Sequence, residues 1–160
     1  MKYYFILNPT AGSGIKGKEF LTRFEELKSK NEYDLNIYET VGVGDSTRFV
    51  AEICTKYPDE DICIFACGGD GTMNEIASGL VHSDTAFAIV PYGSGNGLAR
   101  HLGYSMTPRL ALMQINHGNE MVIDYGIVNN KKFFCTCGTG FDAHISHSFA
   151  TTKKRGFLSY

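Results

Sequence analysis

The sequence has no apolar run that approaches the roughly 20 residues needed to span a membrane as a helix. Its first apolar run ends at Asn8-Pro9 and is too short to serve as a secretory signal peptide. Charge of one sign is not in excess either, because 15 Lys and Arg residues stand against 17 Asp and Glu residues. The net charge of −2 gives no electrostatic reason to expect a nucleic-acid partner.

Zinc-ligand spacing is also missing from the sequence. The five cysteines lie mostly inside apolar runs, so we expect a reduced protein of the cytoplasm. Cys135 and Cys137 would share one face of a strand, which favours packing over redox chemistry. His144 and His147 have a spacing that could bind a metal, but a solvated helix face is the favoured interpretation.

The first 90 residues do contain a regular alternation of short apolar runs and helical patterns. Asp45 or Ser46 is expected to cap the second of these helices. The alternation predicts an α/β domain in which helices flank a parallel sheet and ligands bind at the carboxyl ends of the strands. The expected strands are residues 3–7, 35–39, 62–66 and 86–90.

The pattern changes in the second half of the sequence. A helix is expected to begin at Thr107-Pro108 and to stop at Gly118. Residues 121–128 and 132–137 are strand-like, and Asn129-Asn130 between them is typical of a hairpin turn. We therefore expect a nucleotide-binding α/β domain over residues 1–118 and the beginning of a truncated, β-rich second domain over residues 119–160. The end of the sequence has no stop signal, so a longer parent chain is expected.

Three glycine-rich segments follow expected strands, at residues 8–14, 67–75 and 91–100. Any one of them could be a tight turn, but three at successive strand ends are hard to explain in that way. Glycines let a backbone approach an anion and adopt positive φ, and the amides of a following helix point at phosphate oxygens. Asp70 would repel a phosphate unless a divalent cation lay between them, which indicates metal–nucleotide chemistry. A P-loop is excluded, because no glycine precedes Lys-Ser or Lys-Thr, and a dinucleotide fingerprint fits poorly.

The ordered motifs Asn8-Pro9-x-x-Gly12, Gly68-Gly-Asp-Gly-Thr-x-Asn-Glu75 and Pro91-x-Gly-Ser-Gly-Asn96 resemble the diacylglycerol kinase catalytic domain family. That family also includes sphingosine and ceramide kinases. The resemblance extends through Gly138 to Ala143 and implies the NAD kinase/diacylglycerol kinase-like fold. NAD kinases share only the Gly-Gly-Asp-Gly-Thr core, so the continuation into Asn74-Glu75 favours the lipid kinases.

The resemblance also implies roles for individual residues. Asp70 would position magnesium and phosphate, directly or through water, and Asp124 is a second metal candidate. Asp142 would act on the acceptor side, whereas the general base is expected beyond residue 160. The residues implied in binding ATP are Asn8, Pro9, Thr10, Ala11, Gly12, Thr40, Gly68, Gly69, Asp70, Gly71, Thr72, Asn74, Glu75, Gly93, Ser94, Gly95 and Asn96.

The function that follows is an ATP-dependent lipid kinase that uses Mg²⁺ and transfers the γ-phosphate to a lipid hydroxyl. Such an enzyme would lie in the cytoplasm, in peripheral contact with the membrane surface that holds its acceptor. The oligomeric state is not defined by the sequence, and a homodimer is one candidate. Many bacterial members have Asp where this chain has Gly97, so the acceptor lipid is not defined. The alternatives are an NAD kinase-type phosphotransferase and a nucleotide-binding fragment that is inactive by itself.

Overall fold

A computed structural model of the chain describes residues 1–12, 15–29, 33–115 and 119–151. Its centre is a four-stranded sheet in which all neighbouring strands are parallel, with the order β2-β1-β3-β4. Phe5 on β1 lies opposite Ile37 on β2 and Phe65 on β3. The predicted parallel sheet is confirmed, with strands β1 (Lys2–Leu7), β2 (Asp34–Glu39), β3 (Ile62–Gly68) and β4 (Ala86–Pro91).

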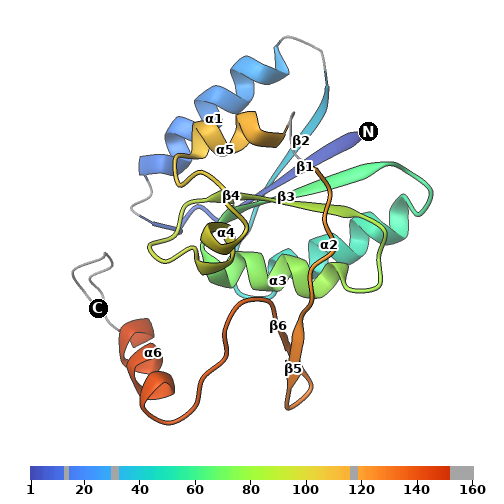
Figure 1. Ribbon diagram of the computed structural model, residues 1–160. Helices are drawn as coiled ribbons and strands as arrows, with labels where there is room; N and C mark the ends of the chain where they lie inside the picture. Colours follow the sequence, from blue (N-terminus) through green and yellow to red (C-terminus); the bar gives the residue numbers. More distant parts are fainter. Residues whose placement is uncertain (13–14, 30–32, 116–118, 152–160) are drawn as a thin grey trace.

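Helices cover both faces of this sheet, because its strands are apolar on both sides. The strand β3 is buried along its whole length, as expected for the centre of a parallel sheet. Helices α1 and α5 lie over one face, and α2 and α3 lie over the other (Figure 1). The bounds are α1 (Ile15–Lys28), α2 (Asp45–Lys56), α3 (Asp70–Leu80), α4 (Gly97–His101) and α5 (Pro108–Ile115).

Each face has its own hydrophobic core. On one side Phe20 and Phe24 of α1 pack with Phe5 and Phe65, and the last two rings are stacked with centroids 4.4 Å apart. On the other side the cluster combines α2, α3 and α4 with the sheet through Val50, Ile53, Met73, Ile76 and Leu98. The two cores fix the helices against the sheet and so fix the loops at its carboxyl edge.

The remaining described residues form a hairpin, β5 (Gly126–Val128) and β6 (Lys131–Phe133), and the helix α6 (Phe141–Thr151). Asn129 and Asn130 form the turn with φ values of 48° and 61°, the pattern of a type I′ turn. The predicted hairpin is confirmed, but both strands are shorter than expected. Cys135 and Cys137 lie after the end of β6 and are exposed, so their expected position on a strand is wrong. An isolated two-stranded hairpin is only marginally stable, so its strand pairing does not extend far from the turn.

The hairpin is attached to the α/β layers through α3, because the Lys132 ammonium donates a hydrogen bond to the Ser78 carbonyl (3.2 Å). Helix α5 begins at Pro108 as predicted, and its expected stop at Gly118 lies outside the described residues. The division into domains at residue 118 stays a prediction. Among the described residues, no helix is both long enough and apolar enough to cross a membrane.

Candidate functional site

The sheet order creates a position at which two chain connections part. From β1 the chain moves outward to β2, and it then crosses to the other side of β1 to form β3. Parallel α/β sheets bind ligands at such a point, outside the carboxyl ends of the strands. Asn8 lies there, with its amide donating to the Cys67 carbonyl (3.0 Å) and its side-chain Nδ2 donating to Thr72 Oγ1 (3.0 Å). The first and second motifs are thus joined directly.

The first loop is held by its own side chains and by the third loop. Thr10 donates from its amide (3.0 Å) and from its hydroxyl (2.8 Å) to Asn8 Oδ1. Gly12 has a φ of 63°, and a Cβ at this position would lie 2.4 Å from the Tyr92 carbonyl oxygen. Only glycine fits this left-handed position against the third loop.

The second and third loops meet through glycines. The amides of Tyr92 and Gly93 both donate to the Gly68 carbonyl, at 2.7 and 3.2 Å. A Cβ on Gly93 would lie 2.6 Å from the Cα of Gly69. Gly69 itself has a φ of −99°, and Gly68 and Gly71 have no positive φ either, so the expected left-handed backbone is wrong for this loop. Close approach of two loops explains Gly69 and Gly93.

Asp70 joins the second loop to the start of α4. Its Oδ2 accepts the Asn96 amide (2.8 Å), and its Oδ1 accepts the Gly97 amide (2.7 Å). The carboxylate is exposed, and each oxygen can accept a further bond. In the part of the chain that the structure describes, no three His, Cys, Asp or Glu side chains lie close enough to hold a metal together. A cation at Asp70 would therefore need phosphate oxygens or water as its other ligands, an arrangement that suits Mg²⁺.

Asn96 is buried and has the left-handed φ of 52°. Its Nδ2 donates to the Gly93 carbonyl (2.7 Å), whereas its Oδ1 has no hydrogen-bond partner. Arg100 closes the same loop by donating from Nε to the Gly95 carbonyl (2.8 Å). A buried oxygen without a donor is costly, so Asn96 Oδ1 is a ready acceptor for a water or ligand hydrogen.

A cleft of about 290 Å³ opens beside these loops. A Cβ added at Gly71 would meet no atom within 4 Å, so this position faces open space. The sequence motifs do not include residues 41–44 of the cleft wall, although Gly42 and Gly44, between a strand and a helix, repeat the signal of the three motifs. The lining residues are Asn8, Thr10, Thr40, Val41, Gly42, Val43, Ser46, Gly71, Thr72 and Glu75.

Two of these lining residues tie the cleft wall to neighbouring elements. The Thr40 amide donates to the Leu7 carbonyl at the end of β1 (2.9 Å). Glu75, on α3, accepts the Gly44 amide at Oε1 (3.1 Å), and its carbonyl accepts the Thr47 hydroxyl (2.9 Å). The predicted residues Thr40 and Glu75 therefore shape the cleft.

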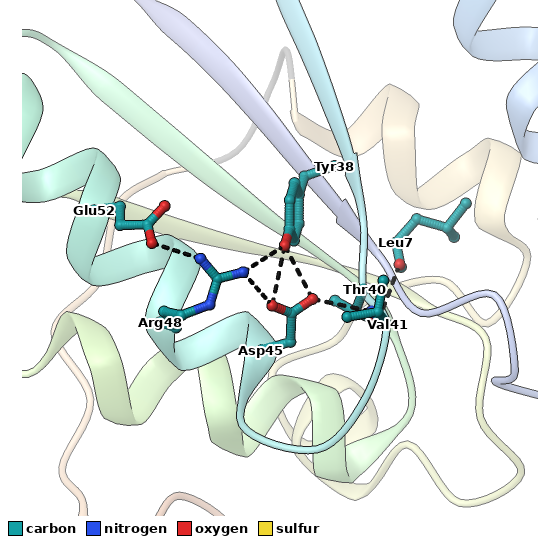
Figure 2. Close-up of polar contacts among 7 residues, drawn as sticks. All are labelled: Leu7, Tyr38, Thr40, Val41, Asp45, Arg48 and Glu52. Atoms are coloured by element: carbon teal, nitrogen blue, oxygen red, sulfur yellow. Dashed lines mark hydrogen bonds and ion pairs between the residues drawn. The ribbon is translucent and has the colours of Figure 1, made fainter.

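Asp45 lies behind the wall and is buried. Gly44, with a φ of 82°, is the residue before α2, so the expected capping by Asp45 or Ser46 is wrong. Instead the Asp45 carboxylate accepts the Val41 amide (2.9 Å) and the Arg48 guanidinium (2.5 Å) (Figure 2). The Val41 hydrogen bond, followed by that of Arg48, lowers the pKa of Asp45 below its usual value.

Several predicted residues lie away from this cleft. Ser94 is exposed on the third loop, and Asn74 is half-buried on α3. Asp124 precedes β5 and Asp142 lies in the first turn of α6, both exposed. Within the described ranges, neither is hydrogen-bonded to the Asp70 loop. Burial raises the pKa of Cys67 far above its usual value, so this motif thiol is a core residue rather than a nucleophile.

Comparison with known proteins decides the family. The model of the diacylglycerol kinase catalytic domain matches residues 2–128. The chain belongs to this family. It is 33% identical to a diacylglycerol kinase of Bacillus subtilis over 97% of the chain and 52% of that relative. It is 28% identical to a diacylglycerol kinase of Staphylococcus aureus over 93% of the chain and 47% of that relative.

Solved structures agree with the diacylglycerol kinase assignment. A diacylglycerol kinase structure from Bacillus anthracis superposes with a TM-score of 0.66 and 30% identity. The match covers 82% of this chain and 47% of that one. The resemblance inferred from the motifs and the predicted fold class are confirmed. The chain spans about half the length of the curated relatives it matches.

Proposed function

We propose that the chain is the nucleotide-binding part of an ATP-dependent lipid kinase that transfers the γ-phosphate of ATP to a lipid hydroxyl. Membership of a kinase family implies ATP as the phosphate donor. The observation that carries the proposal is the convergence of three loops at the sheet edge, beside a cleft into which Gly71 opens. Kinases of this kind work by holding the reactants in line and neutralising charge, which such loops can do.

The phosphates would lie against Asn8–Gly12 and Gly68–Thr72, because Asn8, Thr10 and the start of α3 at Gly71 and Thr72 line the cleft. The partial positive charge of a helix N-terminus favours an anion there. Thr40 and Glu75 also line the cleft and would contact the nucleotide there. Gly93–Asn96 would support the phosphate loop through Gly69 and Asp70.

Magnesium is proposed at Asp70, held through water and the phosphates, with Asp124 as a further carboxylate. Asp70→Asn should reduce the ratio between ATP affinity measured with Mg²⁺ and with a chelator, because the charge that attracts the cation is lost. The melting temperature should also fall, since the Asn96 and Gly97 amides donate to different oxygens of Asp70 and the substitution turns one of these acceptors into an NH2 donor. Calorimetry on both samples measures the ratio.

Asp84→Asn provides the matched control. Asp84 is also exposed, but it precedes β4 at the opposite end of the sheet from the cleft. It should leave both the metal dependence and the melting temperature unchanged. An unchanged metal dependence in Asp70→Asn would remove the metal role from Asp70.

The acceptor side of the proposal consists of a lipid at a membrane surface, peripheral contact from the cytoplasm, and Asp142 near the acceptor. A homodimer belongs to the same proposal, and sedimentation would measure it. The alternative is a nucleotide-binding domain with no activity of its own; the chain spans about half the length of the curated relatives it matches.

A phosphorylation assay with labelled ATP separates these functions. It should be run on the full-length protein and on the 160-residue chain, with diacylglycerol, sphingosine and NAD as acceptors. Labelled lipid in the assay of the full-length protein would support the proposal. If the full-length protein labels lipid and the 160-residue chain does not, the result would support the alternative for this chain. Label on NAD and on neither lipid would overturn the lipid-kinase proposal.

A further inference from the structure

A buried carboxylate lies behind the cleft wall without lining the cleft. The Asp45 side chain is 7% exposed, whereas Arg48 beside it is 57% exposed. The wall itself, Thr40–Gly44, is defined by the end of β2 and the start of α2. The side chains of Val41 and Val43 in this wall are 90% and 100% exposed. Because these two residues bury almost no surface, the wall depends largely on its backbone hydrogen bonds for its position.

Three backbone amides of the wall donate hydrogen bonds, and their acceptors lie on three different elements. Thr40 is tied to β1 through the Leu7 carbonyl, and Gly44 is tied to α3 through the Glu75 carboxylate. Between them, the Val41 amide donates to Asp45 Oδ2 (2.9 Å). Asp45 is thus the partner that fixes the middle of the wall.

Asp45 is itself held firmly in place. The Tyr38 hydroxyl donates to its carboxylate (3.0 Å), and Arg48 Nη2 contacts both the carboxylate and the Tyr38 hydroxyl (Figure 2). The Tyr38 ring is stacked on Phe49 with centroids 3.8 Å apart and planes 6° from parallel. Glu52 pairs with Arg48 at the outer end of the network.

We propose that Asp45 is a positioning residue for ATP: it fixes the Thr40–Gly44 wall before the nucleotide binds and thereby sets nucleotide affinity. The proposal rests on the proposed function, since it takes the cleft as the ATP site. A wall that is already ordered does not have to be ordered on binding, so less of the interaction energy is lost. Asp45 does not line the cleft, so its effect should fall on binding and leave the rate of transfer unchanged.

The variants follow from the order of the network. Asp45→Ala removes the acceptor of the Val41 amide, and it should weaken ATP binding roughly tenfold. Asp45→Asn keeps one acceptor oxygen for that amide and should recover most of the affinity. Glu52→Ala is the matched control, because it removes only the outer contact of Arg48. Tyr38→Phe keeps the stacked ring but removes one donor to Asp45, and it should show a smaller loss in the same direction.

Two measurements on the 160-residue chain test the proposal. Calorimetry with Mg·ATP gives the affinity, and hydrogen exchange without nucleotide gives the protection of the Val41 and Gly44 amides. We expect Asp45→Ala to lose both affinity and Val41 protection, with Glu52→Ala equal to wild type. In the full-length enzyme the KM for ATP should rise about as much as the Kd, and kcat should stay within about twofold.

The outcomes also separate this proposal from the one it rests on. If wild type binds ATP and Asp45→Ala has the same ATP affinity, the role of Asp45 is overturned and the proposed ATP site is not. Full Val41 protection in Asp45→Ala would overturn it as well, whether or not ATP binds. Should Asp45→Ala fail to fold, Tyr38→Phe decides, and unchanged affinity and protection in it would contradict the proposal. Wild type that does not bind ATP would overturn the proposed function itself.

Discussion

Gly69 and Gly71 are two positions apart, yet a methyl group would meet different surroundings at each. At Gly69 it would lie 3.2 Å from the Cα of Gly93, whereas at Gly71 it would meet nothing within 4 Å. Gly71→Ala should therefore leave the melting temperature unchanged or raised. It should weaken ATP binding roughly tenfold to a hundredfold, because a methyl group would displace a phosphate from its amide donor.

Gly69→Ala is the paired variant, and it should lose stability first and ATP affinity only second. Crowding against Gly93 should destabilise the fold by about 1–3 kcal/mol, with ATP affinity falling only as a consequence. Calorimetry beside thermal unfolding measures both quantities. Normal ATP binding by Gly71→Ala would leave the second loop with a structural role alone.

The buried carboxylate Asp45 predicts a pH dependence of stability. Its pKa in the folded chain is below the ordinary value of 3.8, so the ionised form stabilises the fold above that pH. This stabilisation is lost as the pH falls through the lowered pKa. The difference in urea midpoint between wild type and Asp45→Asn should be constant above about pH 5 and should shrink below it.

The groups that face Asp45 are Tyr38 and Arg48, neither of which changes its charge over that acid range. Glu52 contacts Arg48, so a Glu52→Gln variant is the control for its titration. A difference in urea midpoint that does not vary between pH 7 and pH 2 would show that ionisation of Asp45 does not stabilise the fold.

At the scale of residues, the sequence predicts several of the residues that line the cleft but not the contacts between them. The motifs named Asn8, Gly71, Thr72 and Glu75, the family resemblance named Thr40, and all five line the cleft. The pairing of Asp70 with two backbone amides and the pairing of Asp45 with Val41 could not be read from the sequence. Both depend on where loops from different strands meet, and no local pattern records that position.

At the scale of elements, the β5–β6 hairpin depends on two asparagines with positive φ. Asn130→Val should destabilise the hairpin by about 1–2 kcal/mol and so lower its population, because a β-branched residue is strained in the left-handed region. Asn130→Gly should leave it unchanged or more stable. Cross-strand contacts between Ile127 and Lys132, measured by NMR, report the population. Equal populations in the two variants would contradict the type I′ turn.

Elements with strong apolar runs were predicted well, and those without them were not. The strands β1 to β4 each match an apolar run and needed no tertiary information. The helix α4 was missed because its five residues are too few to show a helical period. The ends of β5 and β6 were misplaced, since apolar residues such as Val122 are 99% exposed and do not mark a paired strand.

For the whole molecule, the sheet order matters more than any single motif. The order β2-β1-β3-β4 places β1 beside β3, so the loops after both strands meet at one edge. The β4 loop follows next to them and reaches Gly68 through its amides. The alternation in the sequence predicts the parallel sheet, but the strand order comes from the structure, since several orders satisfy the same alternation.

The loops after β1 and β3 and the adjacent cleft are proposed to bind the phosphates of ATP, and the β4 loop to support them. The most direct test is an NMR titration of the isotope-labelled chain with Mg·ATP, in which amide shifts map the contact surface. We expect shifts that saturate together in Asn8–Gly12, Thr40–Gly44 and Gly68–Thr72, with Gly126–Phe133 unchanged. Saturating shifts confined to other residues, or none at millimolar nucleotide, would contradict it.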